Sequence, residues 1–436
     1  MTALFTRRST LAAAASAPLA ALALPSCVSK KSPAGMFDIG RLSAAGEMID
    51  GLVESGQIPG GAVRISQHGE LLFEHYAGKA DIACGKNIAP DTIYRAYSMT
   101  KPVTAAAIML LVEDGRLSLD DPVTAYVPEF SDLAVYVSQD GEKIVTEPAG
   151  VMRVAHLLTH TSGLSNSWNP GPLSPLYRKA GLVSAKYVYD PEFSAGLSEF
   201  AARLGKIPLQ FQPGSQWLYS ISPDIAGLVV ERVTGTSFSA FLKARIFNPL
   251  GMEDADFYVP APKAERLASM YALKEGSLIL AEAAADSPFL TKPCAESGSA
   301  GLLCTLSDYH RFANMLAEFG ETGGARVMSR KSVRTMTAPH VGAEILGDTF
   351  QKFMGFASGG SGLGMEMALG GAVLTDPAAA EKPGLKGEYT WGGAASTTFF
   401  AVPEAGLSAT LMTQLFPSGT LPLRDMLKTA VYQAMN

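Results

Sequence analysis

The chain has 436 residues, of which 47% are hydrophobic and only 17% charged, and its formal net charge at pH 7 is −6. This length and composition suffice to bury the core of one large domain or two moderate ones. The acidic balance, with no run of more than two Lys or Arg residues, argues against a nucleic-acid partner, because neutralising phosphates needs a clustered cationic surface.

The first 27 residues have the pattern of an export signal. Arg7 and Arg8 precede the apolar stretch Leu11–Leu24, which is shorter than the roughly 20 residues that span a bilayer. The paired arginines resemble a twin-arginine signal, and the segment Leu24–Cys27 resembles a lipoprotein cleavage box. An ordinary signal that happens to contain Cys27 fits the same residues. We therefore expect an exported protein, either periplasmic or anchored to the membrane as a lipoprotein through Cys27.

The part of the chain after the signal begins with strand-type and helical patterns in alternation. Strands show the alternation of polar and apolar residues, and helices show apolar residues on one face. The predicted elements are, in order, a linker over residues 28–41, a helix over 42–55, a hairpin of strands 60–65 and 70–76, a strand-like segment at 92–95, and a helix from Ser98 to Asp114 that Gly115 ends.

The middle of the chain, up to about residue 300, is dominated by helical periods and Pro-rich loops. One helix start is marked by the sequence Ser222-Pro223-Asp224, which combines a capping serine, an early proline and an acid against the positive end of the helix. Strand patterns return near the C-terminus. The predicted elements of this part are a helix from Ser222 to about Gly235, a long Gly-rich surface loop over 355–387, strands at 397–402 and 407–414, and a final helix over 423–435.

Strands near both ends with helices between them predict an α/β (α+β) fold, an antiparallel sheet flanked by helices plus a mainly helical region. We expect one domain over residues 42–436, with the sheet built from 42–100 and 300–436 and the helical region from about 101–299.

Ser98 and Lys101 stand three residues apart at the start of a predicted helix, which places both side chains on one face. A serine hydroxyl is a poor nucleophile without a base nearby, and a lysine can serve if it is held neutral. Moving its pKa from about 10.4 to near 7 requires roughly 4–5 kcal/mol, which burial can supply. The pair is a candidate nucleophile and base, although an isolated match of this kind is usually a solvated helix face.

Two further segments can complete such a site. Tyr219 stands just before the predicted helix at Ser222 and could present its phenol oxygen to the nucleophile, although a core tyrosine fits the same position. Trp391-Gly392-Gly393-Ala394 leads into a predicted strand. Two glycines at a strand edge permit close backbone approach, which suits a wall of oxyanion donors; an ordinary bulge is the alternative.

In this order and spacing, these segments resemble the serine β-lactamase and penicillin-binding protein superfamily, with its β-lactamase/transpeptidase-like fold. Within it, the chain looks most like the family VIII carboxylesterases and related acyltransferases. The resemblance runs from about residue 42 to the end and rests, besides Ser98–Lys101, on residues 92–95, 156–164, 219–224, 298–302 and 391–394.

The resemblance implies roles for individual residues. Ser98 would be the nucleophile, Lys101 its base partner and Tyr219 a second acid/base, while the backbone N–H groups of Ser98 and Ala394 would form the oxyanion hole. Trp391, Gly392 and Gly393 would contact the substrate. Whether Lys101 is neutral or is charged and stabilises a Tyr219 phenolate stays open, since the two groups would titrate as a pair.

Trp391 decides the substrate prediction, because β-lactamases carry a lysine at this position. A lysine holds the carboxylate of a β-lactam or a peptide, whereas an indole offers a neutral ester an apolar wall. We therefore expect acyl-enzyme hydrolysis of short-chain carboxylic esters, without a metal or organic cofactor. The alternatives are a β-lactamase, a D-amino-acid peptidase or an acyltransferase on the same machinery, or a non-catalytic penicillin-binding-like protein.

Several other titratable residues fit structural roles better than chemical ones. The sequence favours helix-packing or loop-anchoring roles for His156 and His160, since no third metal ligand accompanies them. His310 reads as a helix surface residue and Asp224 as a helix-start charge. A disulfide between Cys294 and Cys304 is compatible with an oxidising compartment, although the cysteines show no disulfide framework.

Overall fold

The computed structural model describes residues 36–141, 143–183, 196–358 and 362–436. The expected export signal, its Cys27 and most of the expected linker lie outside these residues. Compact structure runs from Phe37 to Asn436. Ile39–Leu42, at the end of the expected linker, form a 3-10 helix, and Phe37 pairs with Met435 in an isolated β-bridge.

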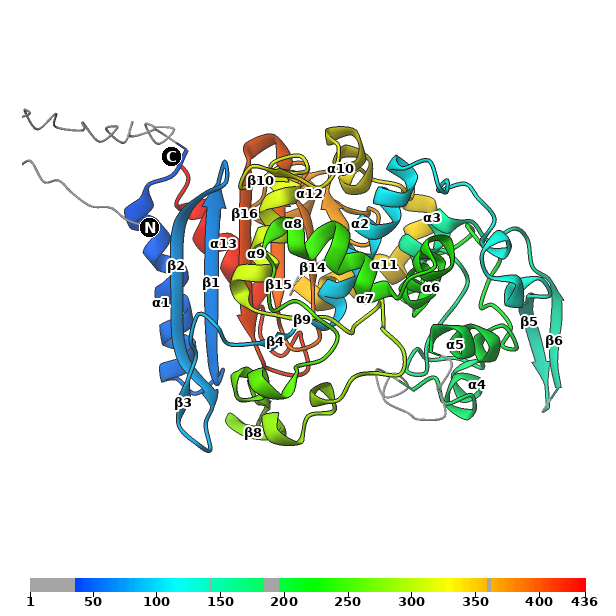
Figure 1. The fold of residues 1–436 in the computed structure, drawn as a ribbon, viewed down its shortest axis with the longest axis horizontal. Coiled ribbons are helices and arrows are strands. Elements are labelled where there is room, and N and C mark those ends of the chain that lie inside the picture. The colour runs from blue at the N-terminus through cyan, green and yellow to red at the C-terminus, as the bar shows by residue number, and fades with distance from the viewer. Residues whose placement is uncertain (1–35, 142, 184–195, 359–361) are drawn as a thin grey trace, which may run out of the picture. The chain divides into compact units, whose positions relative to one another are not determined.

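An eight-stranded antiparallel sheet is the centre of this unit, in the order β12-β13-β14-β15-β16-β1-β2-β3 (Figure 1). Both ends of the folded unit contribute to it, as the strand patterns predict. Its strands are β1 (Gly60–Gln67), β2 (Glu70–Asp81), β3 (Lys86–Asn87), β12 (Met365–Met367), β13 (Ala372–Leu374), β14 (Tyr389–Gly392), β15 (Thr398–Val402) and β16 (Leu407–Thr413).

The first face of the sheet is covered by α1 (Ser43–Glu54) and α13 (Leu423–Gln433), which join the two ends of the unit (Figure 1). Alternation along β1 sends Val63 and Ile65 to this side, where they pack with Ile49 of α1 and Val431 of α13 in one apolar cluster.

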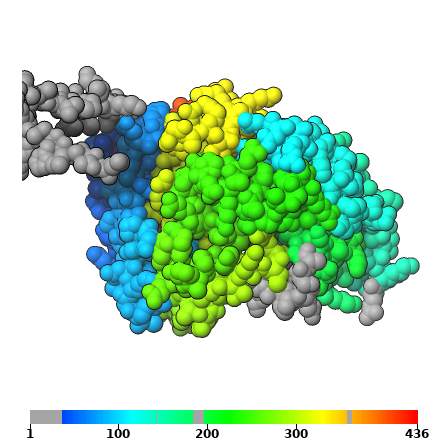
Figure 2. Space-filling model, viewed as in Figure 1, coloured from blue at the N-terminus to red at the C-terminus, as the bar shows by residue number. Residues whose placement is uncertain are grey.

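The second face of the sheet carries α9 (Leu306–Ala317), whereas α2 (Thr100–Glu113) packs mainly on helices of the helical region and on α10 (Arg330–Thr337). Ala62 of β1 and Phe399 of β15 join Leu316 of α9 in a larger apolar cluster that continues into the helical region. In Figure 2 the green part of the chain, which belongs to the helical region, covers the middle of the face shown, and a yellow part lies at its upper edge.

The helical region is built around α2 and α6, whose residues are buried over most of their lengths. It also contains two β-hairpins that helical periodicity did not predict. The remaining helices are α3 (Val154–Leu158), α4 (Ser174–Lys179), α5 (Leu197–Leu204), α6 (Ser222–Thr234), α7 (Phe238–Leu242), α8 (Asn248–Leu250), α10 (Arg330–Thr337), α11 (Ala343–Ser358) and α12 (Pro377–Ala380). The remaining strands are β4 (Tyr94–Arg95), β5 (Ala134–Asp140), β6 (Lys143–Pro148), β7 (Met270–Lys274), β8 (Ser277–Glu282), β9 (Leu303–Cys304), β10 (Glu321–Thr322) and β11 (Ala325–Arg326).

The prediction of a surface loop over residues 355–387 is wrong for the described part of that range. This segment holds the end of α11, the edge strands β12 and β13, and α12. Each of the two strands is only three residues long, too short for alternation to be recognised, and a glycine directly precedes each of them. α11 itself consists of two helical stretches that are broken at Gly347, whose backbone is not helical (φ 53°, ψ −168°).

Within the described part of the chain, no single helix has both the length and the apolar character needed to cross a membrane. Only α6 and the following helical segment Phe238–Leu250, taken together, are long and apolar enough, and the chain bends by 77° between them.

Candidate active site

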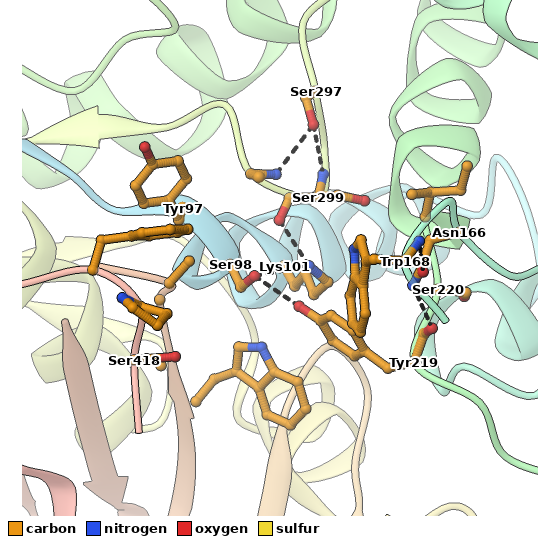
Figure 3. Close-up of a pocket in the computed structure, with 18 of the residues that line it drawn as sticks. Tyr97, Ser98, Lys101, Asn166, Trp168, Tyr219, Ser220, Ser297, Ser299 and Ser418 are labelled. Carbon is orange, nitrogen blue, oxygen red and sulfur yellow. Dashed lines mark hydrogen bonds between the residues drawn. The ribbon is translucent and has the colours of Figure 1, made fainter. Parts of the chain in front are cut away.

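Ser98 lies in a short 3-10 helix, Tyr97–Met99, that runs directly into α2. The residue before it, Tyr97, has a left-handed backbone (φ 45°), which is rare for a non-glycine residue and turns the chain sharply at this point. Ahead of this turn, the N–H of Ala96 donates to the carbonyl of Leu302 at 2.9 Å. The nucleophile expected from the sequence is therefore held between a strand-like segment and a buried helix, and it faces a cavity (Figure 3).

Lys101 follows on the next turn, as the i, i+3 spacing predicts. Its Nζ donates hydrogen bonds to Oγ of Ser98 at 3.2 Å and to the carbonyl of Ser299 at 2.8 Å (Figure 3). Lys101 is only 2% exposed. The side chain is thus largely removed from solvent, and two oxygen partners fix its nitrogen beside the serine.

Tyr219 reaches the same hydroxyl from the segment just before α6. Its Oη donates to Oγ of Ser98 at 2.7 Å, although 121 positions separate the two residues. Asn166 and Asn169 hold the backbone at this point, because the side-chain amide of each donates to the carbonyl of Tyr219 at 2.9 Å. The structure therefore brings together the three side chains that the sequence singles out.

His160 packs against the ring of Tyr219, with 4.7 Å between the ring centroids. Its Nδ1 accepts the N–H of Ser220 at 3.2 Å, so the histidine anchors the residue that follows Tyr219. Burial lowers the pKa of His160 well below its usual value, and the nearby Lys101 lowers it further. The loop-anchoring role expected for His160 agrees with these contacts. His156, four residues earlier, accepts the N–H of Arg153 at the start of α3 (3.2 Å).

Asp224 lies in the first turn of α6, where a helix-start charge was expected. Its carboxylate accepts Oγ–H of Ser297 at 2.6 Å and the N–H of Ser299 at 3.1 Å. Since the carbonyl of Ser299 accepts from Lys101, Asp224 helps to hold the loop that positions the lysine.

The end of β14 brings Trp391–Ala394 to the same cavity. A Cβ on Gly393 would come within 2.2 Å of the carbonyl oxygen of Ala96 and within 2.3 Å of Oγ1 of Thr397. Only glycine therefore lets this segment approach the backbone beside Ser98. Ala394 follows in the cavity lining, and its carbonyl accepts the N–H of Ser418 at 2.7 Å.

The cavity has a volume of about 900 Å³ and an aromatic wall. The rings of Tyr219, Phe353 and Trp391 lie nearly parallel, with centroid distances of 4.6 Å for Tyr219–Phe353, 5.9 Å for Phe353–Trp391 and 6.1 Å for Tyr219–Trp391. The apolar wall that the sequence assigned to Trp391 is thus shared with residues of other elements.

Arg424 is a cation in the cavity lining that the sequence analysis missed. It comes from the first turn of α13 and lies behind Gly392, where a Cβ would come within 2.2 Å of Nη2. Its Nε donates to Oγ1 of Thr398 at 3.3 Å, whereas Nη1 is buried without a hydrogen-bond partner among the residues that the structure describes. Burial lowers the pKa of Arg424 to about 10, so the group stays charged at neutral pH. The cavity therefore does hold a cation that could bind a carboxylate, although Trp391 replaces the lysine of the β-lactamases.

His310 is not a helix surface residue, as the sequence analysis expected. It is 1% exposed and bridges β1 and β16 from α9, with Nε2 2.8 Å from Oγ of Ser66 and Nδ1 3.1 Å from Oγ1 of Thr410. The reason is that α9 lies flat on the sheet, so even its polar residues face strands.

The disulfide considered between Cys294 and Cys304 is absent from the described structure. Both are free cysteines, Cys294 exposed and Cys304 buried.

Comparison with known proteins shows the family of the chain. The Beta-lactamase family model matches residues 46–433. Esterase EstB of Burkholderia gladioli is 32% identical over 388 residues, which cover 88% of this chain and 93% of EstB. Acyltransferase calJ of Penicillium decumbens is 26% identical over 376 residues, 82% of this chain and 84% of calJ.

Solved structures show the same fold. EstCE1, described as a hydrolase with promiscuous acyltransferase activity, superposes with a TM-score of 0.75 at 25% identity, over 90% of this chain and 99% of EstCE1. With nearly all of its folded unit matched, the chain belongs to the β-lactamase family and is one of its serine hydrolases.

Proposed function

We propose that the chain hydrolyses short-chain carboxylic esters through an acyl-enzyme on Oγ of Ser98. One observation carries the proposal: the hydroxyl of Ser98 lies within hydrogen-bond distance of both Nζ of Lys101 and Oη of Tyr219. A serine with two proton-transfer partners at this range meets the geometric requirement for an activated nucleophile. The similarity to EstB, an esterase by name, supports esters as the substrate class.

In the acylation step, the proton of Ser98 passes to the Tyr219–Lys101 pair while Oγ bonds to the ester carbonyl carbon. The N–H groups of Ser98 and Ala394 are our candidates for stabilising the oxyanion, since both residues line the cavity. The bond to the alcohol oxygen then breaks, and the Tyr219–Lys101 pair delivers the proton to that oxygen.

In the deacylation step, the same pair accepts a proton from water as the water oxygen attacks the acyl carbon. The bond to Oγ breaks, Ser98 regains its proton and the carboxylic acid leaves. An alcohol that replaces water in this step gives acyl transfer, which the names of calJ and EstCE1 support as a second activity.

Arg424 favours one further candidate, the binding of a substrate that carries a carboxylate, as β-lactams do. Its buried, incompletely partnered guanidinium is a cation of the kind that carboxylates bind. Neutral esters remain our first choice, because Tyr219, Phe353 and Trp391 form an aromatic wall beside Ser98.

The decisive experiment compares the wild-type protein with Ser98→Ala and Tyr219→Phe on p-nitrophenyl acetate and butyrate and on a chromogenic cephalosporin. We expect ester turnover in the wild type, its loss in Ser98→Ala, and a fall of about 10²–10⁴ in Tyr219→Phe. Intact-mass measurement after rapid quenching should show the acyl group on the wild type alone. Cephalosporin turnover far above ester turnover would overturn the ester assignment, and no acylation by either class would indicate a non-catalytic binding protein.

We further propose that residues 1–27 direct export and that the mature protein is periplasmic or anchored through a lipidated Cys27. The support is the Arg7-Arg8 pair, the short apolar stretch and the Leu24–Cys27 segment. A linker up to about residue 41 would then precede the hydrolase domain. Fractionation of cells that express the wild type, an Arg7→Lys/Arg8→Lys variant or Cys27→Ala tests this, since the first variant should stay in the cytoplasm and the second should lose the membrane association of a lipoprotein.

A further inference from the structure

Trp168 is a large apolar side chain that lines the cavity and yet is 58% exposed. The other two tryptophans, Trp217 and Trp391, are 3% and 2% exposed. An indole left open to solvent at the mouth of a cavity is the kind of surface that a ligand covers.

Asn166 connects Trp168 to Tyr219, the residue that donates to Ser98. Its backbone N–H donates to Oδ1 of Asn166 at 3.1 Å, and Nδ2 of the same asparagine donates to the carbonyl of Tyr219 at 2.9 Å. The two rings lie 5.8 Å apart with an interplanar angle of 43° (Figure 3). The backbone of Trp168 is therefore anchored beside Tyr219, and its indole contacts the Tyr219 ring, before any ligand binds, which lowers the entropic cost of using it as a binding surface.

Trp168 extends an aromatic wall whose other rings stack on one another. Tyr219 and Phe353 are nearly parallel, at 24°, and so are Phe353 and Trp391, at 27°. Because stacked rings cover one another's faces, the largely exposed indole of Trp168 is the ring of this wall that offers an open face to a planar group. The three stacked rings do not form the mutually perpendicular walls that would surround a compact cation.

The direction of proton transfer decides which half of an ester meets this surface. The alcohol oxygen must receive its proton as the C–O bond breaks, so it has to lie within hydrogen-bond distance of Oη of Tyr219. The rest of the alcohol then extends from that oxygen past the Tyr219 ring toward Trp168 and Phe353. The acyl chain leaves the carbonyl carbon on the other side of Ser98, where Figure 3 shows Tyr97.

From these contacts we infer that Trp168, together with Phe353, forms the alcohol subsite, and that the preferred esters carry a planar, uncharged aromatic or polycyclic alcohol. The inference rests on the proposed ester chemistry of Ser98. It makes Trp168 a specificity-determining residue, and it assigns the short acyl group to the side of Tyr97.

Aromatic surfaces also bind cationic alcohols such as choline, but the charge of such an alcohol does not suit this site. Nζ of Lys101 lies 4.6 Å from the centroid of the Tyr219 ring, so the same face is already occupied by a positive group. A quaternary ammonium ion would be repelled by this lysine when it is protonated.

The test varies the alcohol while the acyl group stays acetyl. We expect kcat/KM for 2-naphthylmethyl acetate to exceed that for methyl acetate, and 3,3-dimethylbutyl acetate to exceed its isosteric cation acetylcholine. In Trp168→Ala the naphthylmethyl-to-methyl ratio should fall about tenfold, mostly through KM, whereas Trp168→Phe should restore most of it. Val151→Ala is the control, since Val151 is 59% exposed and does not belong to the cavity lining.

A binding measurement separates this inference from the proposed hydrolysis. Titration of 2-naphthylmethanol into Ser98→Ala needs no turnover, and adding Trp168→Ala should weaken its Kd about tenfold. If the alcohol binds in this way but the wild type shows no esterase activity, the proposed hydrolysis is contradicted, whereas the aromatic subsite is supported. An unchanged naphthylmethyl-to-methyl ratio together with an unchanged Kd in the Trp168 variants overturns the inference, as does a preference for acetylcholine.

Discussion

Nζ of Lys101 lies over the face of the Tyr219 ring, 4.6 Å from its centroid, and the same nitrogen donates to Oγ of Ser98. A single amine therefore contacts both residues of the Ser98–Tyr219 hydrogen bond, the serine at its hydroxyl and the tyrosine at its ring. When it is protonated it stabilises a negative charge on either oxygen, and when it is neutral it can accept the serine proton directly. The three groups form one proton-transfer unit, in which a change to the lysine acts on the other two.

Lys101→Met keeps the length of the side chain and removes its nitrogen. We expect kcat/KM for p-nitrophenyl acetate to fall by about 10²–10⁴, because Ser98 loses a partner and the Tyr219 phenol loses the adjacent amine. Steady-state hydrolysis measures the loss, and circular dichroism checks the fold. Lys331→Met, on the exposed surface of α10, should behave as the wild type. A Lys101→Met enzyme with more than a tenth of the wild-type activity would contradict the shared proton unit.

Gly393→Ala tests how closely β14 must approach the residues before Ser98. The new Cβ would lie 2.2 Å from the carbonyl oxygen of Ala96, so the strand end and the adjacent Ala394 have to move away. If the N–H of Ala394 stabilises the oxyanion, we expect kcat to fall by about 10²-fold. Gly51→Ala in α1 is the matched control, since a Cβ there meets nothing within 4 Å. Activity close to that of the wild type in Gly393→Ala would show that the approach is not required.

The sequence predicts those site residues that are close together in the chain or that belong to a segment resembling a known family. Ser98 and Lys101 share a helix turn, and the structure confirms that they meet. Tyr219 lies 121 positions from Ser98, so no local spacing places it beside the serine. Its position before a helix start made it a candidate, and the resemblance assigned it the role.

Other features depend on contacts that leave no local pattern. Asn166 binds a backbone carbonyl, which any hydrogen-bonding side chain at that point could do. Arg424 reaches the cavity only because position 392 has no side chain. His310 looked like a helix surface residue, since a single helix does not reveal that its polar side also lies against a sheet. The same limit applies to β12 and β13, whose three residues each are too few for a periodic signal.

His310 should make the free energy of unfolding depend on pH. Burial lowers its pKa to about 3, with the Arg64 cation as the second cause, whereas the unfolded chain has the usual value near 6.5. Between these values the unfolded state binds the extra proton, so stability is complete above about pH 6.5 and falls as the pH drops toward 3, by up to about 1.4 kcal/mol per pH unit.

Urea denaturation of the wild type and His310→Gln at pH 7.5, 6.5, 5.5 and 5.0 measures this contribution. The wild type should lose stability relative to the variant at the two lowest pH values. Parallel pH profiles for the two proteins would show that His310 titrates alike in the folded and unfolded states.

Glu282→Gln should destabilise the fold through Arg95. The guanidinium of Arg95 is 0% exposed, and its Nε and Nη2 donate to Oε1 of Glu282 at 2.9 and 2.5 Å. Removing the carboxylate charge leaves a buried cation without its counterion, which typically costs about 3–5 kcal/mol. Denaturant unfolding measures the change. Glu404→Gln, which breaks the exposed pair with Arg334, should leave the unfolding midpoint unchanged; equal effects of the two substitutions would rule out a special role for burial.

The bridge between Phe37 and Met435, together with the 2.8 Å hydrogen bond from the N–H of Asp38 to the carbonyl of Ala434, places the two ends of the folded unit next to each other. A short flexible linker could therefore join residue 436 to residue 37. New termini could then be opened between Gly323 and Gly324, in the exposed turn of the β10–β11 hairpin. Such a circular permutant would test whether the order in which the sheet strands leave the ribosome matters for folding, since β1 would then be synthesised after β12–β16 rather than before them.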